Sequence, residues 1–378
     1  MKTEMTQWTQ SSWMPHQPGE LADAQFVLVF GSREQFKHAE HFSLLQAAYP
    51  NAIMVGCSTS GEIFGSTVSD ETLTVTAVWF EHTTVEAAHV ELRDVYNNSY
   101  HAGRSLVTAL PKEGLAHAFV LSEGNYVNGS ELVRGITAGL PEGVALTGGL
   151  AGDADRFEET LVMYNGSVSS GKIVLVGLYG DRLKVGFGSM GGWDPFGPKR
   201  TVTRSQGSIL YELDGQNALS MYKKYLGPYA SELPASALLF PLAIKQDGDD
   251  QPELVRTILS IDENVQAMRF AGDIPEGAQA RFMKANFGRL VDGAEGAAKN
   301  SYASIGEQTP DLAILISCVG RKLVLKDKSA EEIRSVRAVL GMDAAVTGFY
   351  SYGEICPTAP NASCALHNQT MTITTLSE

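Results

Sequence analysis

The chain repeats one structural unit three times, and this repeat constrains its fold more than any other feature of the sequence. Each copy has an apolar strand, a loop, an amphipathic helix, a second apolar strand and a glycine turn. The first strands lie at residues 26–30, 118–121 and 312–316, the second strands at 53–55, 144–146 and 344–346, and the turns at 56–63, 148–153 and 348–355. Uninterrupted apolar strands joined by helices are typical of parallel pairs that are covered on both faces. We therefore predict an α/β fold.

The helices of the three copies are predicted at residues 35–48, 130–140 and 329–340. Ser130 is placed to cap the second helix. Ser329 and Glu332 have the spacing of a capping box, in which each side chain accepts a backbone N–H of the first turn. These residues mark the expected starts of the second and third helices.

Stretches rich in β-forming residues separate the repeats. Residues 85–90 are expected to pair with the alternating strand at 73–79, and Asn165-Gly166 is a strong hairpin signal. Residues 173–179 and 183–188 extend that hairpin as a β-meander. The predicted fold is thus α/β, with mixed sheets from repeated strand-helix-strand units and β-meander insertions. A boundary near residues 205–225 would separate halves at 21–215 and 216–378, after an N-terminal segment at 1–20.

An acidic residue ends each glycine turn: Glu62, Asp153 and Glu354. The first and third turns share the pattern Gly-x-x-x-x-Gly-Glu-Ile at the same place in the repeat. Ligands of α/β sheets tend to bind beyond the carboxyl ends of the strands, where these turns fall. The acids either converge on one pocket for an amine, a polar ligand or a metal, or they cap helices and bond turn backbone.

Charge and composition exclude several classes of partner. The 378-residue chain has a formal net charge of -14, which disfavours nucleic acid and membrane as partners. The N-terminus lacks the apolar core of a signal peptide, and no run is long enough to span a bilayer. The four cysteines are sparse and form no Cys-x-x-Cys pair, so we expect a reduced, cytoplasmic setting.

Three of the cysteines and one histidine form a candidate metal set. Cys356 and Cys364 are followed by His367, and Cys318 ends the neighbouring strand of the same repeat. Thiolates and imidazole suit zinc, an iron–sulfur cluster or haem iron, although the spacing is not a standard metal signature. The alternative interpretation is a set of isolated buried cysteines.

Signals for catalysis are weak, and we predict no catalytic residue. The chain has no Gly-x-Ser-x-Gly and no His-Glu-x-x-His motif. Ser58 and Thr59 are candidate nucleophiles for a hydrolase or transferase, but hydroxyls just before a glycine more often bond to turn backbone. A hydrolase is therefore the least favoured reading, after a small-ligand sensor and a metal- or thiol-based redox sensor.

Several motifs resemble, in order, those of FIST-domain sensory proteins. They lie at residues 55–63, 147–153, 192–195 and 213–215 in the N-terminal half, and at 240–244, 317–321, 349–357 and 367–370 in the C-terminal half. The resemblance implies a bacterial intracellular sensor of a small ligand. It also implies a separate signalling partner, either a histidine kinase, a cyclic-di-GMP enzyme or a chemotaxis receptor. The chain resembles the stand-alone, nitric-oxide-sensing haem proteins of this family, the NosP type.

The resemblance also suggests site residues. In the family a histidine often precedes the tryptophan that aligns with Trp193, where this chain has Gly191 and Gly192. His367 is then the next candidate for an axial haem ligand. From the turns and the family motifs together, we expect the ligand to contact Cys57, Ser58, Thr59, Gly61, Glu62, Gly149, Asp153, Arg321, Tyr352, Glu354 and Asn368.

Overall fold

Three sheets with one shared strand order form the larger part of the molecule. The computed structural model describes residues 1–233, 235–246, 253–358 and 362–378. From one edge to the other, each of these sheets has a two-stranded hairpin, the two strands of a repeat, and two antiparallel strands. In this order, the first sheet contains β12 (Ser167–Ser169), β11 (Val162–Tyr164), β4 (Ile53–Ser58), β3 (Phe26–Gly31), β7 (Leu73–Trp79) and β1 (Lys2–Trp8), with β2 (Trp13–Met14) beyond.

The other two sheets repeat the same order. The second contains β27 (Cys364–His367), β26 (Gly353–Pro357), β10 (Ala145–Leu150), β9 (Leu115–Ser122), β13 (Lys172–Tyr179) and β8 (Thr84–Glu91). The third contains β6 (Thr67–Ser69), β5 (Glu62–Phe64), β25 (Ala345–Ser351), β24 (Leu312–Cys318), β28 (Met371–Ser377) and β14 (Lys184–Met190). The parallel pairs predicted within the repeats, β3–β4, β9–β10 and β24–β25, are all confirmed.

Both faces of each repeat strand are buried, which explains why these strands are apolar without interruption. In β3, for example, Phe26, Leu28 and Phe30 face a central core that all three sheets share. Val27 and Val29 face the opposite way, into a core under the helices of the first sheet. The predicted α/β class with mixed sheets is therefore confirmed.

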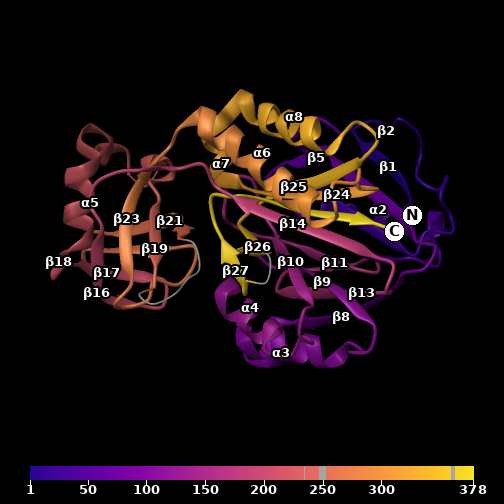
Figure 1. Ribbon diagram of the computed structural model, residues 1–378, viewed down its shortest axis with the longest axis horizontal. Coiled ribbons are helices and arrows are strands. Elements are labelled where there is room, and N and C mark those ends of the chain that lie inside the picture. Colours follow the sequence, from indigo (N-terminus) through magenta and orange to yellow (C-terminus); the bar gives the residue numbers. More distant parts are fainter. Residues whose placement is uncertain (234, 247–252, 359–361) are drawn as a thin grey trace.

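Helices cover the outer face of each sheet (Figure 1). They are α1 (Arg33–Phe36) and α2 (Ala39–Ala48) on the first sheet, α3 (Ser99–Ala109) and α4 (Gly129–Thr137) on the second, and α6 (Phe287–Ser304) and α8 (Ser329–Leu340) on the third. The shorter α7 (Val319–Leu325) follows β24 directly. No helix among the described residues has the length and apolarity needed to cross a membrane.

Each hairpin leaves its own repeat and completes the sheet of another. The β5–β6 hairpin follows β4 but pairs with β25 of the third sheet. Likewise, β11–β12 follows β10 but pairs with β4, and β26–β27 follows β25 but pairs with β10. The exchange runs in a closed cycle, so the three repeats interlock.

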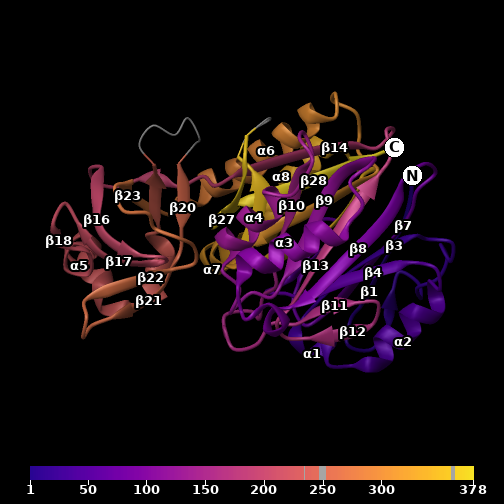
Figure 2. The same cartoon turned by 90° about the horizontal axis from the view of Figure 1, so that it is seen from below.

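A separate antiparallel unit, which we call the insert (residues 193–285), lies between β14 and α6 and forms its own lobe (Figures 1 and 2). Its strands are β15 (Asp194–Pro195), β16 (Arg200–Gln206), β17 (Ile209–Leu213), β18 (Gln216–Asn217), β19 (Leu242–Lys245), β20 (Leu254–Arg256), β21 (Ile258–Asp262), β22 (Ala267–Phe270) and β23 (Gln279–Lys284). Together with α5 (Ala218–Leu226) they enclose a core of their own. The boundary proposed at residue 215 falls in the β17–β18 turn of this lobe.

Some local pairings differ from expectation. Strands β7 and β8 do not pair with each other: β7 lies between β1 and β3, whereas β8 pairs with β13 in another sheet. The consecutive strands β13 and β14 also enter different sheets. Open sheet edges elsewhere in the molecule offer the same hydrogen bonds as a neighbour in sequence. The Asn165-Gly166 hairpin is confirmed, with positive φ at both residues and β11 paired to β12.

Both predicted helix caps are wrong. The side chain of Asn128 caps α4 by accepting from the Glu131 N–H at 3.1 Å, and Ser130 lies inside the helix. Helix α8 starts at Ser329, after an N-cap residue whose side chain accepts no hydrogen bond. The carboxylate of Glu332 turns into the protein to bind Arg321, so a buried ion pair replaces the capping box.

Candidate ligand-binding site

The three chain segments that leave the repeats for another sheet are hydrogen-bonded to one another. The backbone N–H of Ser60 donates to the carbonyl of Tyr350 at 2.8 Å, and the N–H of Gly152 donates to that of Ser58 at 2.8 Å. The N–H of Tyr352 completes the cycle by donating to Leu150 O at 3.3 Å. The acidic turns predicted from the sequence thus meet where the sheets exchange hairpins.

Glu62 and Glu354 occupy equivalent positions in this arrangement. Each lies six residues after the glycine of its second strand, Gly56 or Gly348. Both side chains are buried, with 1% and 0% of their surface exposed. Burial raises the pKa of Glu62 to about 7 and that of Glu354 to about 8, against the opposing effect of their hydrogen bonds.

The hydrogen bonds of the two glutamates also correspond. The Thr59 hydroxyl donates to Glu62 Oε1, and Thr72 donates its N–H and hydroxyl to Oε2 at 3.0 and 2.6 Å. Around Glu354 the donors are the Ser351 hydroxyl at 2.8 Å, and the N–H and hydroxyl of Thr370 at 3.2 and 2.9 Å. Thr72 directly precedes β7, and Thr370 directly precedes β28. The donors therefore hold each carboxyl at the start of the strand by which the chain returns to the sheet of its own repeat.

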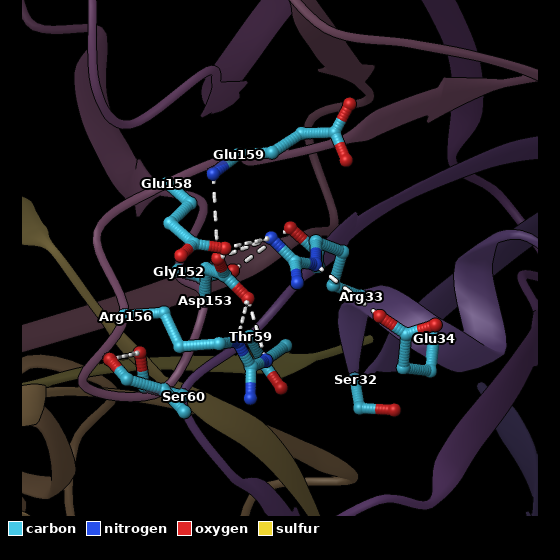
Figure 3. Close-up of polar contacts among 12 residues, drawn as sticks. Ser32, Arg33, Glu34, Thr59, Ser60, Gly152, Asp153, Arg156, Glu158 and Glu159 are labelled. Atoms are coloured by element: carbon cyan, nitrogen blue, oxygen red, sulfur yellow. Dashed lines mark hydrogen bonds and ion pairs between the residues drawn. The ribbon is translucent and has the colours of Figure 1, made fainter.

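Asp153 departs from this pattern because it lies only five residues after its glycine, Gly148. Its carboxylate is fully buried and binds two arginines (Figure 3). Arg156 donates to Oδ1 at 2.8 and 2.6 Å, and Arg33 donates to Oδ2 at 2.9 Å. Asp153 therefore anchors the loop that follows β10, and the three acids do not form one cluster.

A pocket of about 680 Å³ lies beside the first of the three turns. Glu62 reaches its surface together with Thr59, Ser60 and Gly61, all from the first repeat. The second repeat contributes the loop at residues 154–156, and the third contributes α7 and the residues after it. Since all three repeats supply a wall, the pocket exists only when the cycle of sheets is closed.

The pocket walls carry both signs of charge. The acidic groups are Glu62, Asp70, Glu71, Asp155 and Asp327, and the basic groups are Arg156, Lys322 and Lys326. Lys322 spans the pocket by donating to the carbonyl of Ser60 at 2.8 Å and to the Asp70 carboxylate. Such walls suit a small polar molecule that has an ammonium group and a carboxylate.

Of the predicted ligand contacts, Thr59, Gly61 and Glu62 line this pocket, and Asp153 touches it through its partner Arg156. The others have different surroundings. Cys57 lies in the central core, and the Ser58 hydroxyl donates to Gly152 O at 2.8 Å. The ring of Tyr352 stacks on that of Phe157. Gly149 in β10 lies opposite Glu354 in the neighbouring strand β26. Arg321 forms a buried ion pair with Glu332. Asn368 is buried, and its amide atoms have no hydrogen-bond partner among the described residues.

Sequence reasoning missed the walls that come from outside the glycine turns. Asp70 and Glu71 follow the β5–β6 hairpin, and Lys322 and Lys326 lie in and after α7. The only local signal for Lys322 was that it directly follows the family motif ending at Arg321. Its side chain meets the first turn through a contact between residues more than 250 positions apart, which no local pattern reports.

The candidate metal residues do not come together as a site. No group of three or more His, Cys, Asp or Glu side chains in the described parts of the chain is arranged to hold a metal ion. The Cys364 thiol donates to Leu146 O at 3.2 Å, and burial raises the pKa of Cys318 to about 12. Burial also raises the pKa of Cys356.

Neither the Nε2 atom of His367 nor a histidine at position 192 is available to a haem iron. The Nε2 atom of His367 lies 2.9 Å from the carbonyl of Cys356, which accepts its proton and leaves this nitrogen unable to bind a metal. A histidine in place of Gly192 has no room, because a Cβ there would lie 1.9 Å from the carbonyl of Arg289. We therefore derive no function through haem.

Comparison with known proteins matches both halves of the chain to families. Residues 25–216 match the FIST N domain, and residues 218–357 match the FIST C domain. An uncharacterized protein of Methanocaldococcus jannaschii is 24% identical over 219 residues, which is 55% of this chain and 41% of that protein. The chain thus aligns with less than half of that relative, whose name states no activity.

Proposed function

The chain belongs to the FIST family, whose domains are associated with sensing in signal transduction, and we propose that it senses a small zwitterionic ligand in the pocket beside Glu62. A free amino acid has the required chemistry. The observation that carries this proposal is a buried, hydrogen-bonded carboxyl at the surface of a pocket with both signs of charge.

The charges of the walls suggest how such a ligand would lie. Its ammonium group would face the carboxyl of Glu62, with Asp70 on the same side of the pocket. Its carboxylate would face Lys326, because Lys322 and Arg156 are already paired with Asp70 and Asp153. No ion-pair partner of Lys326 occurs among the described residues. Charge-assisted hydrogen bonds of this kind are short and strong when water is partly excluded.

A second part of the proposal concerns the output. We expect the bound state to be read by a separate signalling protein, such as a histidine kinase, a cyclic-di-GMP enzyme or a chemotaxis receptor. The pocket supports this expectation because its walls come from all three repeats, so that a ligand contacts segments distant in the chain.

The binding test is isothermal titration of the protein with the free amino acids, first for the wild type and then for the Glu62→Gln variant. Loss of the carboxyl oxygen that would accept from the ligand's ammonium group should weaken binding about tenfold or more. Glu354→Gln is a matched control, because Glu354 has equivalent hydrogen bonds but does not line the pocket. The proposal fails if no amino acid binds the wild type, or if both variants weaken binding equally.

A further inference from the structure

Helix α7 has two functional faces. One face lines the pocket with Val319, Lys322 and Leu323. The other packs against the insert in a small apolar core, which consists of Trp193, Ala243, Met283, Leu290, Val324 and Leu325. A single short helix therefore separates the proposed ligand from the lobe that projects out of the three-sheet body (Figure 1).

Arg321 connects this helix to both chain connections of the insert. Its guanidinium is fully buried and paired with Glu332 at 2.7 Å. It also donates to the carbonyl of Gly191, just before the insert, and to that of Leu290 at 2.7 Å, just after it. The next residue, Lys322, holds the carbonyl of Ser60 in the pocket wall. Adjacent residues of one helix thus hold the pocket and the two connections.

These two connections have the features of a hinge. The chain enters the insert through Gly192, whose φ of +100° suits glycine, and it leaves through Asn286. The two connections are tied together, since Asn286 donates to Asp194 Oδ2 at 2.9 Å and Arg289 donates to Oδ1 at 2.7 Å. A lobe held by two adjacent, tied segments can rotate about them as a unit.

Elsewhere, hydrogen bonds join the insert to the body. Asn128 at the start of α4 donates to Asp273 Oδ1 at 3.1 Å, and the buried Arg256 donates to Leu366 O at 2.8 Å. Relative motion of two lobes is the normal expectation unless their interface is large and hydrophobic, and the main core of the insert is its own.

From these contacts we infer that α7 couples the pocket to the hinge of the insert. A ligand whose ammonium group lies beside Glu62 and Asp70 competes with the ammonium of Lys322 for Asp70, and this changes the contact between α7 and Ser60. The change passes through the helix to Arg321, and so to the carbonyls of Gly191 and Leu290. The insert is then the part of the molecule whose position reports occupancy. This inference rests on the proposed function for the identity of the ligand, but the coupling itself is a property of the ligand-free protein.

The coupling is tested by hydrogen-exchange mass spectrometry on the intact, ligand-free chain. Lys322→Gln removes the link to Ser60 and Asp70, so exchange in the hinge segments 187–196 and 284–292 should accelerate at least about fivefold, the lower end of ordinary coupling. Lys326→Gln removes a neighbouring pocket lysine that makes no such link, and the hinge should then exchange as in the wild type. Unchanged hinge exchange in Lys322→Gln, or equal acceleration in both variants, would overturn the inference.

A second variant guards against a folding defect at Lys322. Asp70→Asn leaves α7 intact and removes the ion-pair partner of Lys322 on the opposite wall, at a side chain that is 65% exposed. It should accelerate hinge exchange in the same direction, and the absence of any change would also count against the coupling. Because no ligand is added, failure here leaves the titration result standing, and failure of the titration leaves this result standing.

Discussion

At the scale of single residues, the same buried carboxyl group holds a turn in place at Glu354, and at Glu62 it also reaches the pocket. Glu62 and Glu354 receive equivalent hydrogen bonds, yet Glu62 reaches the pocket and Glu354 does not line it. Their raised pKa values follow from burial and not from the pocket, since both residues show the shift. Glu62 therefore stabilises the segment that leaves the first repeat for another sheet, and it also has access to a ligand.

The raised pKa values predict that stability falls as the pH rises through neutrality. An unfolded glutamate has a pKa of about 4.3, whereas Glu62 and Glu354 titrate near 7 and 8 in the folded protein. The folded state holds protons that the unfolded state has released. The stabilisation is thus complete below the unfolded pKa and is lost as the pH passes the folded values, by about 1.4 kcal/mol for each unit of difference.

Urea unfolding of the wild type between pH 6.5 and 8 should show this loss, and the double variant Glu62→Gln, Glu354→Gln should show a much flatter profile. Burial lowers the pKa of His367 to about 4, so its own effect on stability lies between that value and the unfolded value of about 6.5, at the lower edge of this range. An identical slope in the wild type and the double variant would mean that neither carboxyl is protonated in the folded protein.

At the scale of elements, a glycine in each second strand allows close contact with the first strand. A Cβ atom at Gly56, Gly148 or Gly348 would lie 2.2, 2.0 or 1.8 Å from the carbonyl oxygen of the paired residue. Each glycine lies just before the segment that leaves its repeat for another sheet. The close approach of the two strands therefore positions the end of the second strand where that segment begins. This accounts for glycine at this position of every repeat.

Substitution of Gly348 should therefore destabilise the protein strongly. A methyl group 1.8 Å from Leu315 O forces the β24–β25 pair apart, and we expect Gly348→Ala to lower the free energy of unfolding by about 3 kcal/mol or more. Gly288, in the first turn of α6, has room for a Cβ atom, which would lie in ordinary contact 3.7 Å from Asn286 Oδ1. Gly288→Ala should be neutral or stabilising because alanine favours the helix. Urea unfolding of the two variants at one pH compares them, and similar losses would refute the steric argument.

At the scale of the whole molecule, the closed exchange of hairpins makes the three repeats one cooperative unit. The third sheet depends on β5 and β6 of the first repeat, and the second depends on β26 and β27 of the third. The chain ends also meet, since the N-terminal amine lies 3.9 Å from Glu378 Oε2. The family-domain boundary in the sequence is thus not a boundary of the central core.

This interlocking predicts that residues 1–216, which contain the match to the FIST N domain, do not fold alone. In that fragment β10 has no β26, β14 has no β28, and the central core lacks one of its three sheets. Circular dichroism should show no cooperative unfolding. A chain in which a short Gly-Ser linker replaces residues 195–284 should unfold cooperatively, because Asp194 and Asn286 are already hydrogen-bonded. A monomeric, cooperatively unfolding 1–216 fragment would contradict the interlocked core.

The sequence by itself determined the repeat, its parallel strand pairs and the positions of its acidic turns. These features depend on local periodicity, since a strand buried on both faces is apolar throughout and a close approach requires glycine. Tertiary structure alone decided which sheet each hairpin joins, that Asp153 forms ion pairs apart from the glutamates, and that α7 forms the wall facing Glu62. The physical reason is that strand edges all offer the same backbone hydrogen bonds. The choice between them comes from packing among residues that are far apart in the chain.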